Sequence, residues 1–236
     1  MEEFRYKLAI GNRILVNEGL TELGRGHMVY YLGDGKMMIP AHLHNYERSI
    51  ADCKESDIVT IDLDGRVIEG KYPSSMGEFY FYSELFSRRS DVRAAAHFHP
   101  YYANLLVMSG KELLMMSRDS FVFVDGIPVH SGLPLYIGNR SDAAQLVNKM
   151  GRSNVVMHRG HGAFVAGTSI ENVTVTAAAL ERACKKQFMA YQVGTPLVYD
   201  KDEIKRTTSK DLVEDLAATD WSYFVSRLEK RVISPI

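Results

Sequence analysis

The chain has 236 residues, of which 46 % are hydrophobic and 24 % are charged, as in folded globular proteins and unlike disordered ones. Lys and Arg total 28 against 29 Asp and Glu, so a net charge of −1 argues against nucleic acid or an anionic membrane as partner. The two cysteines cannot build a disulfide framework or a thiolate zinc site, and we therefore expect a cytoplasmic protein that acts on a small molecule.

The first third of the chain predicts a helix followed by two hairpins. No segment has the apolar length of a signal peptide or a membrane span, and no linker divides the chain, so we expect one domain over residues 1–236 without membrane association. Apolar spacing predicts an amphipathic helix over 4–19. Glycine-containing turns at 33–35 and 64–65 predict hairpins that join strands 27–32 with 36–39 and 58–63 with 66–69.

Helices and strands alternate after the hairpins. Strands that begin as hairpins and then alternate with helices favour a mixed α/β layer structure over a doubly wound parallel sheet. No GxGxxG or Walker pattern supports a nucleotide-binding loop. The pattern predicts helices over 77–89, 100–109, 139–149, 169–192 (capped by Thr168 or Ser169) and one or two within 209–232, and strands over 94–97, 121–124, 154–158 and 163–166.

Two histidines near the middle of the chain carry the first chemical signal. His97 and His99 are two residues apart, and on a strand this spacing sends both imidazoles to the same face. Imidazole binds zinc, manganese, iron and copper, but two ligands leave a metal under-coordinated. Isolated pairs of this kind are more often ordinary surface or core histidines, so a third ligand decides the interpretation.

His161 is the best candidate for that third ligand. It lies between Gly160 and Gly162 on a predicted turn between two strands, where ligands are often displayed. His158 is the alternative, and a histidine in such a turn also has a purely structural interpretation. From the residues alone, three interpretations stay open: a metal site completed by His161, one completed by His158, and a purely structural histidine in the turn.

Several motifs taken together resemble the class II aldolase/adducin family. They are Pro73-Ser74-Ser75, the stretch from Gly77-Glu78 to Phe86, residues 89–92, His97-Phe98-His99-Pro100 and residues 158–165, and the likeness runs from the first helix to the helix after His161. The resemblance implies a three-layer α/β/α fold with a mostly antiparallel mixed central sheet. It also implies one divalent metal ion per subunit, zinc or manganese with iron as an alternative, held by His97, His99 and His161.

The resemblance assigns the acid/base role to a glutamate 19 residues before the histidine pair, which is Glu78. Glu84 is the fallback, and His27 is a second candidate proton donor. The family's metal acts as a Lewis acid on substrate oxygens while a carbon–carbon bond breaks. Decarboxylases and aldolases share this chemistry, so the reaction is a metal-dependent lyase reaction (EC 4.1).

A departure from the phosphate-binding pattern separates the two reactions. Sugar-phosphate aldolases of the family carry a Thr-Gly-Asn-type loop after the first helix, where this chain has Leu23-Gly24-Arg25-Gly26-His27. Residues 26–27, 77–84, 126–129 and 159–162 look more like the branch of decarboxylases for hydroxylated aromatic or pyridine dicarboxylates. That likeness implies decarboxylation through a metal-stabilised, enolate-like intermediate.

Candidate substrate-binding residues follow from residue chemistry and from the resemblance. Arg25, Arg159 and Arg182 are candidates for gripping a carboxylate, each with a surface or structural role as the alternative. The resemblance implies a homotetramer with active sites at subunit interfaces, where the tail (about 205–236) packs on a neighbouring subunit. It also adds residues that bind an anion or cover the substrate. The added residues are Ser74, Ser75, Tyr102, Trp221 and Tyr223.

Three other functions remain open at this stage. The first is a class II aldolase that acts on a sugar, a sugar phosphate or a hydroxy-ketone. The second is an iron-dependent oxygenase that uses the same three imidazoles. The third is a non-catalytic, adducin-like binding domain, which the presence of all three histidines and the glutamate disfavours.

Overall fold

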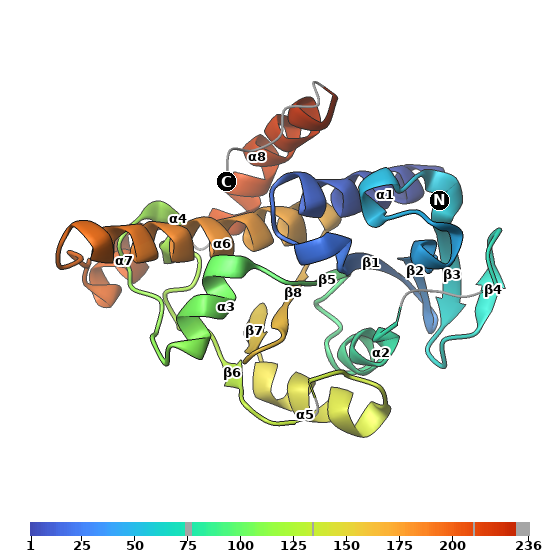
Figure 1. Ribbon diagram of the computed structural model, residues 1–236, viewed down its shortest axis with the longest axis horizontal. Coiled ribbons are helices and arrows are strands. Elements are labelled where there is room, and N and C mark those ends of the chain that lie inside the picture. Colours follow the sequence, from blue (N-terminus) through green and yellow to red (C-terminus); the bar gives the residue numbers. More distant parts are fainter. Residues whose placement is uncertain (74–76, 134, 210, 230–236) are drawn as a thin grey trace.

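The computed structural model describes residues 1–73, 77–133, 135–209 and 211–229 (Figure 1). Within them an eight-stranded sheet has the order β4-β3-β2-β1-β5-β8-β7-β6, antiparallel except for the parallel pair β6–β7. The strands are β1 (Gly26–Gly33), β2 (Lys36–Pro40), β3 (Ile58–Asp62), β4 (Val67–Glu69), β5 (Ala94–Phe98), β6 (Val129–His130), β7 (Val155–His158) and β8 (Gly162–Gly167). The mixed sheet confirms the predicted fold class.

Helices cover both faces of this sheet. Figure 1 shows α1 (Glu2–Asn17) and α6 (Ile170–Val193) on one side and α2 (Phe79–Arg88) and α5 (Arg140–Met150) on the other, which gives three layers. The remaining helices are α3 (Tyr101–Met108), α4 (Arg118–Phe121), α7 (Lys201–Thr207) and α8 (Leu212–Glu229), and short 3-10 turns are η1 (Glu22–Gly24), η2 (Leu43–Tyr46), η3 (Ile50–Asp52) and η4 (Glu55–Asp57).

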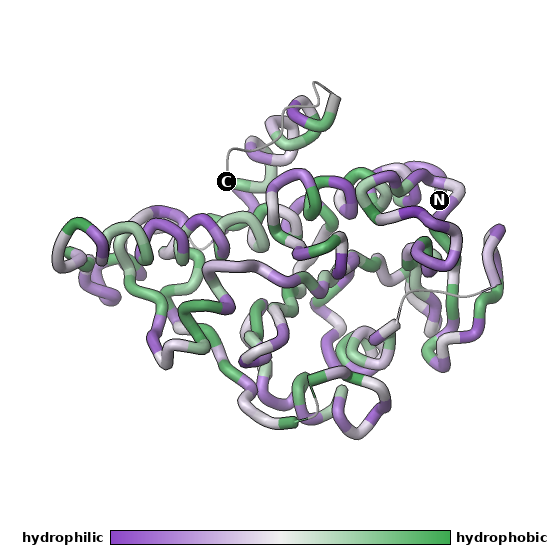
Figure 2. The backbone as a smooth tube through the Cα atoms, in the orientation of Figure 1, coloured by the Kyte–Doolittle hydropathy of each residue, from purple (hydrophilic) through white to green (hydrophobic). Residues whose placement is uncertain are grey.

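Burial on both faces explains the sequences of the central strands. Every residue of β5 and of β8 is buried, and Figure 2 shows hydrophobic segments concentrated in the middle of the molecule. Strands covered on both faces lose the alternation of polar and apolar residues. Small residues at 94–96 let the helices of both layers pack closely on the sheet's centre, which fixes the position of the histidines that follow.

Most predicted elements agree with the structure. Both hairpins form around the predicted turns, with Tyr30 opposite Met38 in the first and Ile61 opposite Val67 in the second. The long helix α6 begins after Ser169, whose hydroxyl accepts a hydrogen bond from the amide of Asn172. Thr168, the alternative cap, instead donates to Glu214 on α8.

The strand predicted over residues 121–124 is wrong. Residues 118–121 form the short helix α4, and turns continue to residue 125. The hydroxyl of Ser120 accepts from the amides of Met116 and Ser117 and donates to the carbonyl of Ser117. These local side-chain bonds satisfy the backbone in a helical turn and override the β-propensity of the apolar run. The strand of this region is β6, a few residues later.

The predicted helical part of the tail, 209–232, contains one helix in its described part, α8, and α7 precedes it. α8 contacts α6 and α1 of the same chain, and Figure 1 shows it rising from the layer that those helices form. Among the described residues, no helix has the length and apolar character that crossing a membrane requires.

Candidate functional site

The three predicted metal ligands come together at one end of the central strands. His97 belongs to β5, His99 stands just past the end of that strand, and His161 lies in the turn between β7 and β8. Antiparallel pairing of β5 with β8 places Phe98 opposite Ala163, which brings the turn against the histidine pair. One ligand atom from each histidine lies within 4.8 Å of the others.

Hydrogen bonding orients the imidazole of His97 for metal binding. Its Nδ1 lies 3.1 Å from the carbonyl oxygen of Ala163, which can only accept, so this nitrogen carries the proton and Nε2 presents its lone pair. Nε2 of His97 is 2.9 Å from Nε2 of His99. A backbone acceptor behind a ligating histidine is the usual arrangement in metal sites, because it fixes the tautomer and the ring orientation.

Gly162 allows the histidines to pack this closely. A Cβ atom there would lie 2.5 Å from the carbonyl oxygen of Phe98, 2.8 Å from the ring of His99 and 3.1 Å from the ring of His97. The preceding Gly160 has φ of +77°, a conformation that strains any residue with a side chain. The Gly-His-Gly sequence is therefore required by the geometry of the turn.

Glu78 faces the histidines from the opposite side of the site. Its Oε2 lies 3.2 Å from Nε2 of His97, and its Oε1 lies 3.9 Å from Nε2 of His161 and accepts a hydrogen bond from the amide of Ile137. The residue precedes α2 with φ of 60°, a left-handed conformation that costs a non-glycine residue about 1 kcal/mol or more, and its side chain does not cap the helix.

The charge state of Glu78 follows from two opposed effects. Burial raises the pKa of the carboxyl, but the electrostatic influence of His97, with that of His161 and the hydrogen bond from the Ile137 amide, lowers it to about 2 overall. Glu78 is therefore a carboxylate at neutral pH. Its negative charge and its two oxygens suit it to bind a cation or to accept a proton from a ligand.

Two imidazoles of the site, those of His99 and His161, are neutral at neutral pH. Burial lowers the pKa of His99 to about 3 and that of His161 to about 4, and the charge of His97 lowers both further. A neutral imidazole keeps the lone pair that a metal needs. Nitrogen ligands about 2.0–2.1 Å from a tetrahedral zinc ion are roughly 3.4 Å apart. That value lies between the 2.9 Å that separates Nε2 of His97 from Nε2 of His99 and the 4.8 Å within which all three ligand atoms lie. The donor set thus fits a divalent cation.

His27 lies beside the metal ligands without belonging to them. It is opposite His97 in the β1–β5 pairing, and the ring centroids are 6.2 Å apart. Its side chain is 2 % exposed, its Nε2 has no hydrogen-bond partner among the described residues, and burial, with the charge of His97, lowers its pKa to about 3. His27 is thus a neutral imidazole next to the cation site.

A cavity of about 450 Å³ opens in front of these groups. It combines the three metal ligands with both predicted proton carriers, His27 and Glu78, and with the predicted anion-binding Arg25. Sequence reasoning missed four lining side chains: His42, His44, Leu135 and Tyr136. His42 and His44 repeat the spacing of His97 and His99, and that spacing was the signal available for them.

The structure does not bring the other predicted residues into this cavity. Glu84 pairs with Arg140 of α5 at 3.5 Å and with Arg88 of its own helix at 2.7 Å. Its predicted fallback role as the acid/base therefore has no geometric support. Arg182 pairs with Asp119 and Asp220. Three more lie outside the cavity lining: the exposed Arg159, Tyr102, which packs on Phe188, and Tyr223, which is 56 % exposed on α8.

Two further predicted residues lie outside the described part of the chain, whereas the alternative ligand His158 lies within it. Ser74 and Ser75 lie outside the described residues. His158 is buried, its Nε2 lies 3.1 Å from the carbonyl oxygen of Gly132, and it is not part of the ligand cluster. Its ring packs against His161 at 5.4 Å, so it supports the turn.

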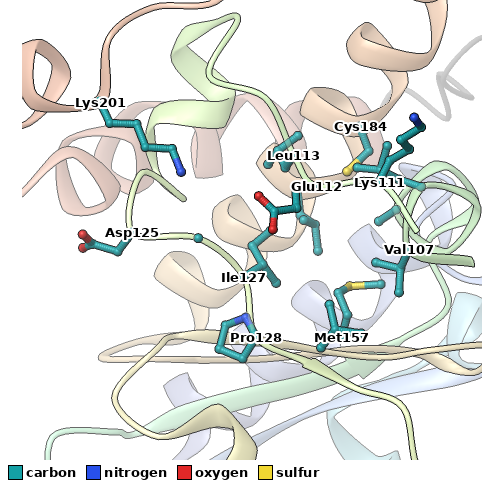
Figure 3. A pocket seen from close by; sticks show the side chains of 15 residues that line it. Val107, Lys111, Glu112, Leu113, Asp125, Ile127, Pro128, Met157, Cys184 and Lys201 are labelled. Carbon is teal, nitrogen blue, oxygen red and sulfur yellow. The ribbon is translucent and has the colours of Figure 1, made fainter. Parts of the chain in front are cut away.

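A second cavity, of about 440 Å³, has a different character. Figure 3 shows Val107, Ile127, Met157 and the thiol of Cys184 around it, with Lys201 and other charged side chains near its rim. Burial raises the pKa of Cys184, so its thiol is protonated and is no nucleophile at neutral pH. The described lining of this cavity contains no histidine, and we therefore place the candidate active site in the first cavity.

The comparisons with known proteins agree with this geometry. The sequence matches the model of the class II aldolase and adducin N-terminal domain over residues 7–188. The chain belongs to the class II aldolase/adducin family. It is 30 % identical over 187 residues to a 3,4-dihydroxyphthalate decarboxylase of Arthrobacter keyseri, covering 75 % of this chain and 74 % of that protein.

Other relatives include an aldolase and a solved structure of the same fold. A 5-deoxy-D-ribulose 1-phosphate aldolase of Bacillus thuringiensis is 24 % identical over 213 residues, 89 % of this chain and 96 % of that protein. The crystal structure of an aldolase II superfamily protein from Pseudomonas syringae has a TM-score of 0.79 at 22 % identity, covering 98 % and 94 % of the two chains, which shows the fold. The named relatives are lyases, in agreement with the predicted metal-dependent lyase.

Proposed function

We propose that the protein is a divalent-metal-dependent decarboxylase of the cytoplasm that acts on a hydroxylated aromatic carboxylate bearing a second acidic group. The 30 % identity to a 3,4-dihydroxyphthalate decarboxylase, over three-quarters of both chains, is the observation that carries this proposal. The chemistry of the cavity agrees with it. Six histidines, one glutamate and one arginine line a space large enough for a single-ring acid.

In this proposal His97, His99 and His161 hold one zinc or manganese ion. When bound, the cation supplies Lewis acidity, which stabilises the negative charge that develops as the carbon–carbon bond breaks. Imidazole ligands add no negative charge to a bound cation, so this set of three would leave its positive charge available for the substrate. Elemental analysis of the purified protein tests the site, and we expect about one divalent ion per chain.

Glu78 transfers the proton, and His27 orients the hydroxyl that supplies it. Because Glu78 is ionised at neutral pH, it starts the cycle as a base: one of its carboxylate oxygens takes the proton of the ring hydroxyl next to the departing carboxylate. After CO2 leaves, the same oxygen returns this proton to the ring carbon. The unpartnered Nε2 of His27, buried in the same cavity, orients the substrate hydroxyl. The phenolic oxygen regains a proton from solvent on product release.

The remaining lining residues bind the rest of the substrate. Arg25 is the cavity's arginine and suits a second carboxylate, because a guanidinium meets a carboxylate with two parallel hydrogen bonds. His42 and His44 add hydrogen-bond donors to the same cavity, and Tyr136 with Leu135 gives it an aromatic and apolar wall. Such a wall favours a flat ring over an extended sugar.

We also propose that the chain works as a homotetramer in which the tail, about residues 205–236, reaches a neighbouring subunit. The 56 % exposed Tyr223 on α8 supports this proposal, since an aromatic side chain exposed to this extent is suited to an interface. Light scattering on the purified protein tests it. A mass four times that of the chain is the expected result, and a monomer contradicts it.

A panel of hydroxylated benzene mono- and dicarboxylates, including 3,4-dihydroxyphthalate, tests the decarboxylase directly. We expect CO2 release that requires the metal, with dicarboxylates turned over faster than monocarboxylates. Protein treated with a chelator and Glu78→Gln serve as controls. No CO2 from any member with metal-loaded protein contradicts the proposal.

The second candidate is an aldolase acting on a sugar phosphate or hydroxy-ketone. The alignment with 5-deoxy-D-ribulose 1-phosphate aldolase over 96 % of that protein favours it. Cleavage of that sugar phosphate, followed by aldehyde release, is the matching assay. Activity there, beside an inactive panel of aromatic acids, assigns the site to the aldolase reaction.

A further inference from the structure

Helix α3 connects two of the three proposed metal ligands, and a carboxylate from another helix holds its beginning. α3 starts at Tyr101, two residues after His99, and its N-cap residue Pro100 makes no side-chain cap. The first amides of a helix have no partner within it. Glu181 on α6 supplies the partners: one oxygen accepts from the amide of Tyr102 at 2.8 Å and the other from Ala103 at 3.0 Å.

The position of Glu181 makes this contact rigid. Its side chain is 8 % exposed and lies on α6, the 24-residue helix that packs across the sheet. A buried carboxylate at a helix N-terminus is stabilised by the helix dipole as well as by its hydrogen bonds. His99 stands one residue past the end of β5 and two residues before α3. Its backbone is therefore constrained by the sheet on one side and by α3, which Glu181 holds, on the other.

Asn104, one turn further along α3, holds the third ligand. Its side-chain Nδ2 donates to the carbonyl oxygen of His161 at 3.0 Å. The turn that carries His161 has glycine on both sides, which gives it little stiffness of its own. A single helix therefore sets the positions of both ligands that lie outside the strands.

Two unpartnered atoms indicate a second role for Asn104. Its Oδ1 and the Nδ1 of His161 are both buried and make no hydrogen bond among the described residues. A histidine that binds metal through one nitrogen usually donates from the other to a nearby acceptor, as His97 does toward Ala163. The amide oxygen of Asn104 is an acceptor of the required kind on a residue that already contacts His161.

We propose that Glu181 and Asn104 are positioning residues of the metal centre, Glu181 through α3 for His99, and Asn104 directly for His161. Neither residue lines the cavity. The inference rests on the proposed metal site and is independent of the reaction that the site catalyses. Its test is therefore the binding of metal, measured without substrate.

The probes are Zn2+ and Co2+ added to protein stripped of metal. We measure the dissociation constant by competition with a chelator and record the absorption spectrum of bound Co2+, which reports ligand geometry. We expect Asn104→Ala and Glu181→Gln each to weaken Zn2+ binding by ~10–100-fold, the usual effect of losing a partner behind a metal ligand, and to change the Co2+ spectrum.

Gln187→Ala is the matched control. Gln187 is also buried on α6 and also bonds a backbone segment, accepting from the amide of Leu114 at 2.7 Å and donating to the carbonyl of Glu112 at 2.9 Å, away from the histidines. It should lower thermal stability yet leave the Zn2+ dissociation constant within about twofold and the Co2+ spectrum unchanged. If Glu181→Gln does not fold, Asn104→Ala decides, since its bond restrains one turn.

Equal metal affinities in Asn104→Ala, Glu181→Gln and Gln187→Ala overturn the inference. A wild-type protein that binds no metal contradicts the proposed function first and removes the basis of the inference. A wild-type protein that binds metal but shows no lyase activity leaves the comparison of variants fully informative. The two failures are thereby separated.

Discussion

A methyl group added at Gly162 tests whether the close packing of the histidines creates the metal site. In Gly162→Ala the new Cβ meets the carbonyl oxygen of Phe98 at 2.5 Å and the ring of His99 at 2.8 Å. Ordinary contacts are about 3.5–4.0 Å, so the turn and β5 must separate by roughly 1 Å. Metal-ligand distances tolerate only ~0.2 Å, and the ligands sit on both segments.

The expected cost has two parts. Overpacking of this kind destabilises a protein by about 1–3 kcal/mol, and each kcal/mol lowers the melting temperature of a domain of this size by about 2–4 °C. The metal-free variant should therefore melt roughly 2–12 °C lower than the wild type. Because the ligands are also displaced, Zn2+ affinity should fall by at least ~100-fold, the upper end of the effect of perturbing a ligand's support.

Thermal unfolding of the metal-free protein and chelator competition for Zn2+ measure the two parts separately. Gly194→Ala is the control, because a Cβ there meets no atom within 4 Å. It should match the wild type in both assays. A Gly162→Ala protein that loses stability but keeps wild-type Zn2+ affinity would falsify the link between this packing and the metal centre.

Three further predictions concern individual side chains. His161→Ala should leave no stoichiometric metal in elemental analysis, and one retained ion per chain contradicts its role as a ligand. Glu78→Gln should keep the metal and lose at least ~10²-fold in turnover, the scale of a lost general base; wild-type turnover moves the role to another group. In the metal-free protein, His27 binds a proton near pH 6.5 when the chain is unfolded but only near pH 3 when it is folded. As the pH falls below 6.5, His27 should therefore lower the free energy of unfolding by up to ~1.4 kcal/mol per pH unit. Urea titrations at several pH values should show that the free energy of unfolding of His27→Asn falls less steeply with decreasing pH than that of the wild type. An unchanged slope refutes this.

The convergence of His97, His99 and His161 could be predicted from sequence because their geometry is local. The spacing of His97 and His99 determines a common face once β5 is recognised, and Gly160 and Gly162 identify the turn that carries His161. The convergence of the two segments needed only one pairing, that of β5 with β8. Resemblance to the family added Glu78, which no spacing rule relates to the histidines.

The rest of the cavity depends on segments without periodic structure. His42 and His44 lie in and beside the 3-10 turn η2, where a spacing of two residues defines no face, so their pattern could not be interpreted as that of a strand pair. Leu135 and Tyr136 belong to the irregular segment before α5. Glu84 lies within α2 and pairs with Arg88 and Arg140, and it does not line the cavity.

The conformation of Glu78 shows how the fold favours chemistry over local stability. An acidic residue at the start of α2 would ordinarily stabilise the helix by accepting its free amides. Glu78 instead adopts a left-handed backbone conformation and makes no cap, and its carboxylate turns to His97 and the amide of Ile137. The cost is tolerated because the strand, the helix and the segment before α5 all constrain this residue. Backbone strain of this kind is concentrated at functional sites, so the conformation of Glu78 agrees with its proposed role as a base.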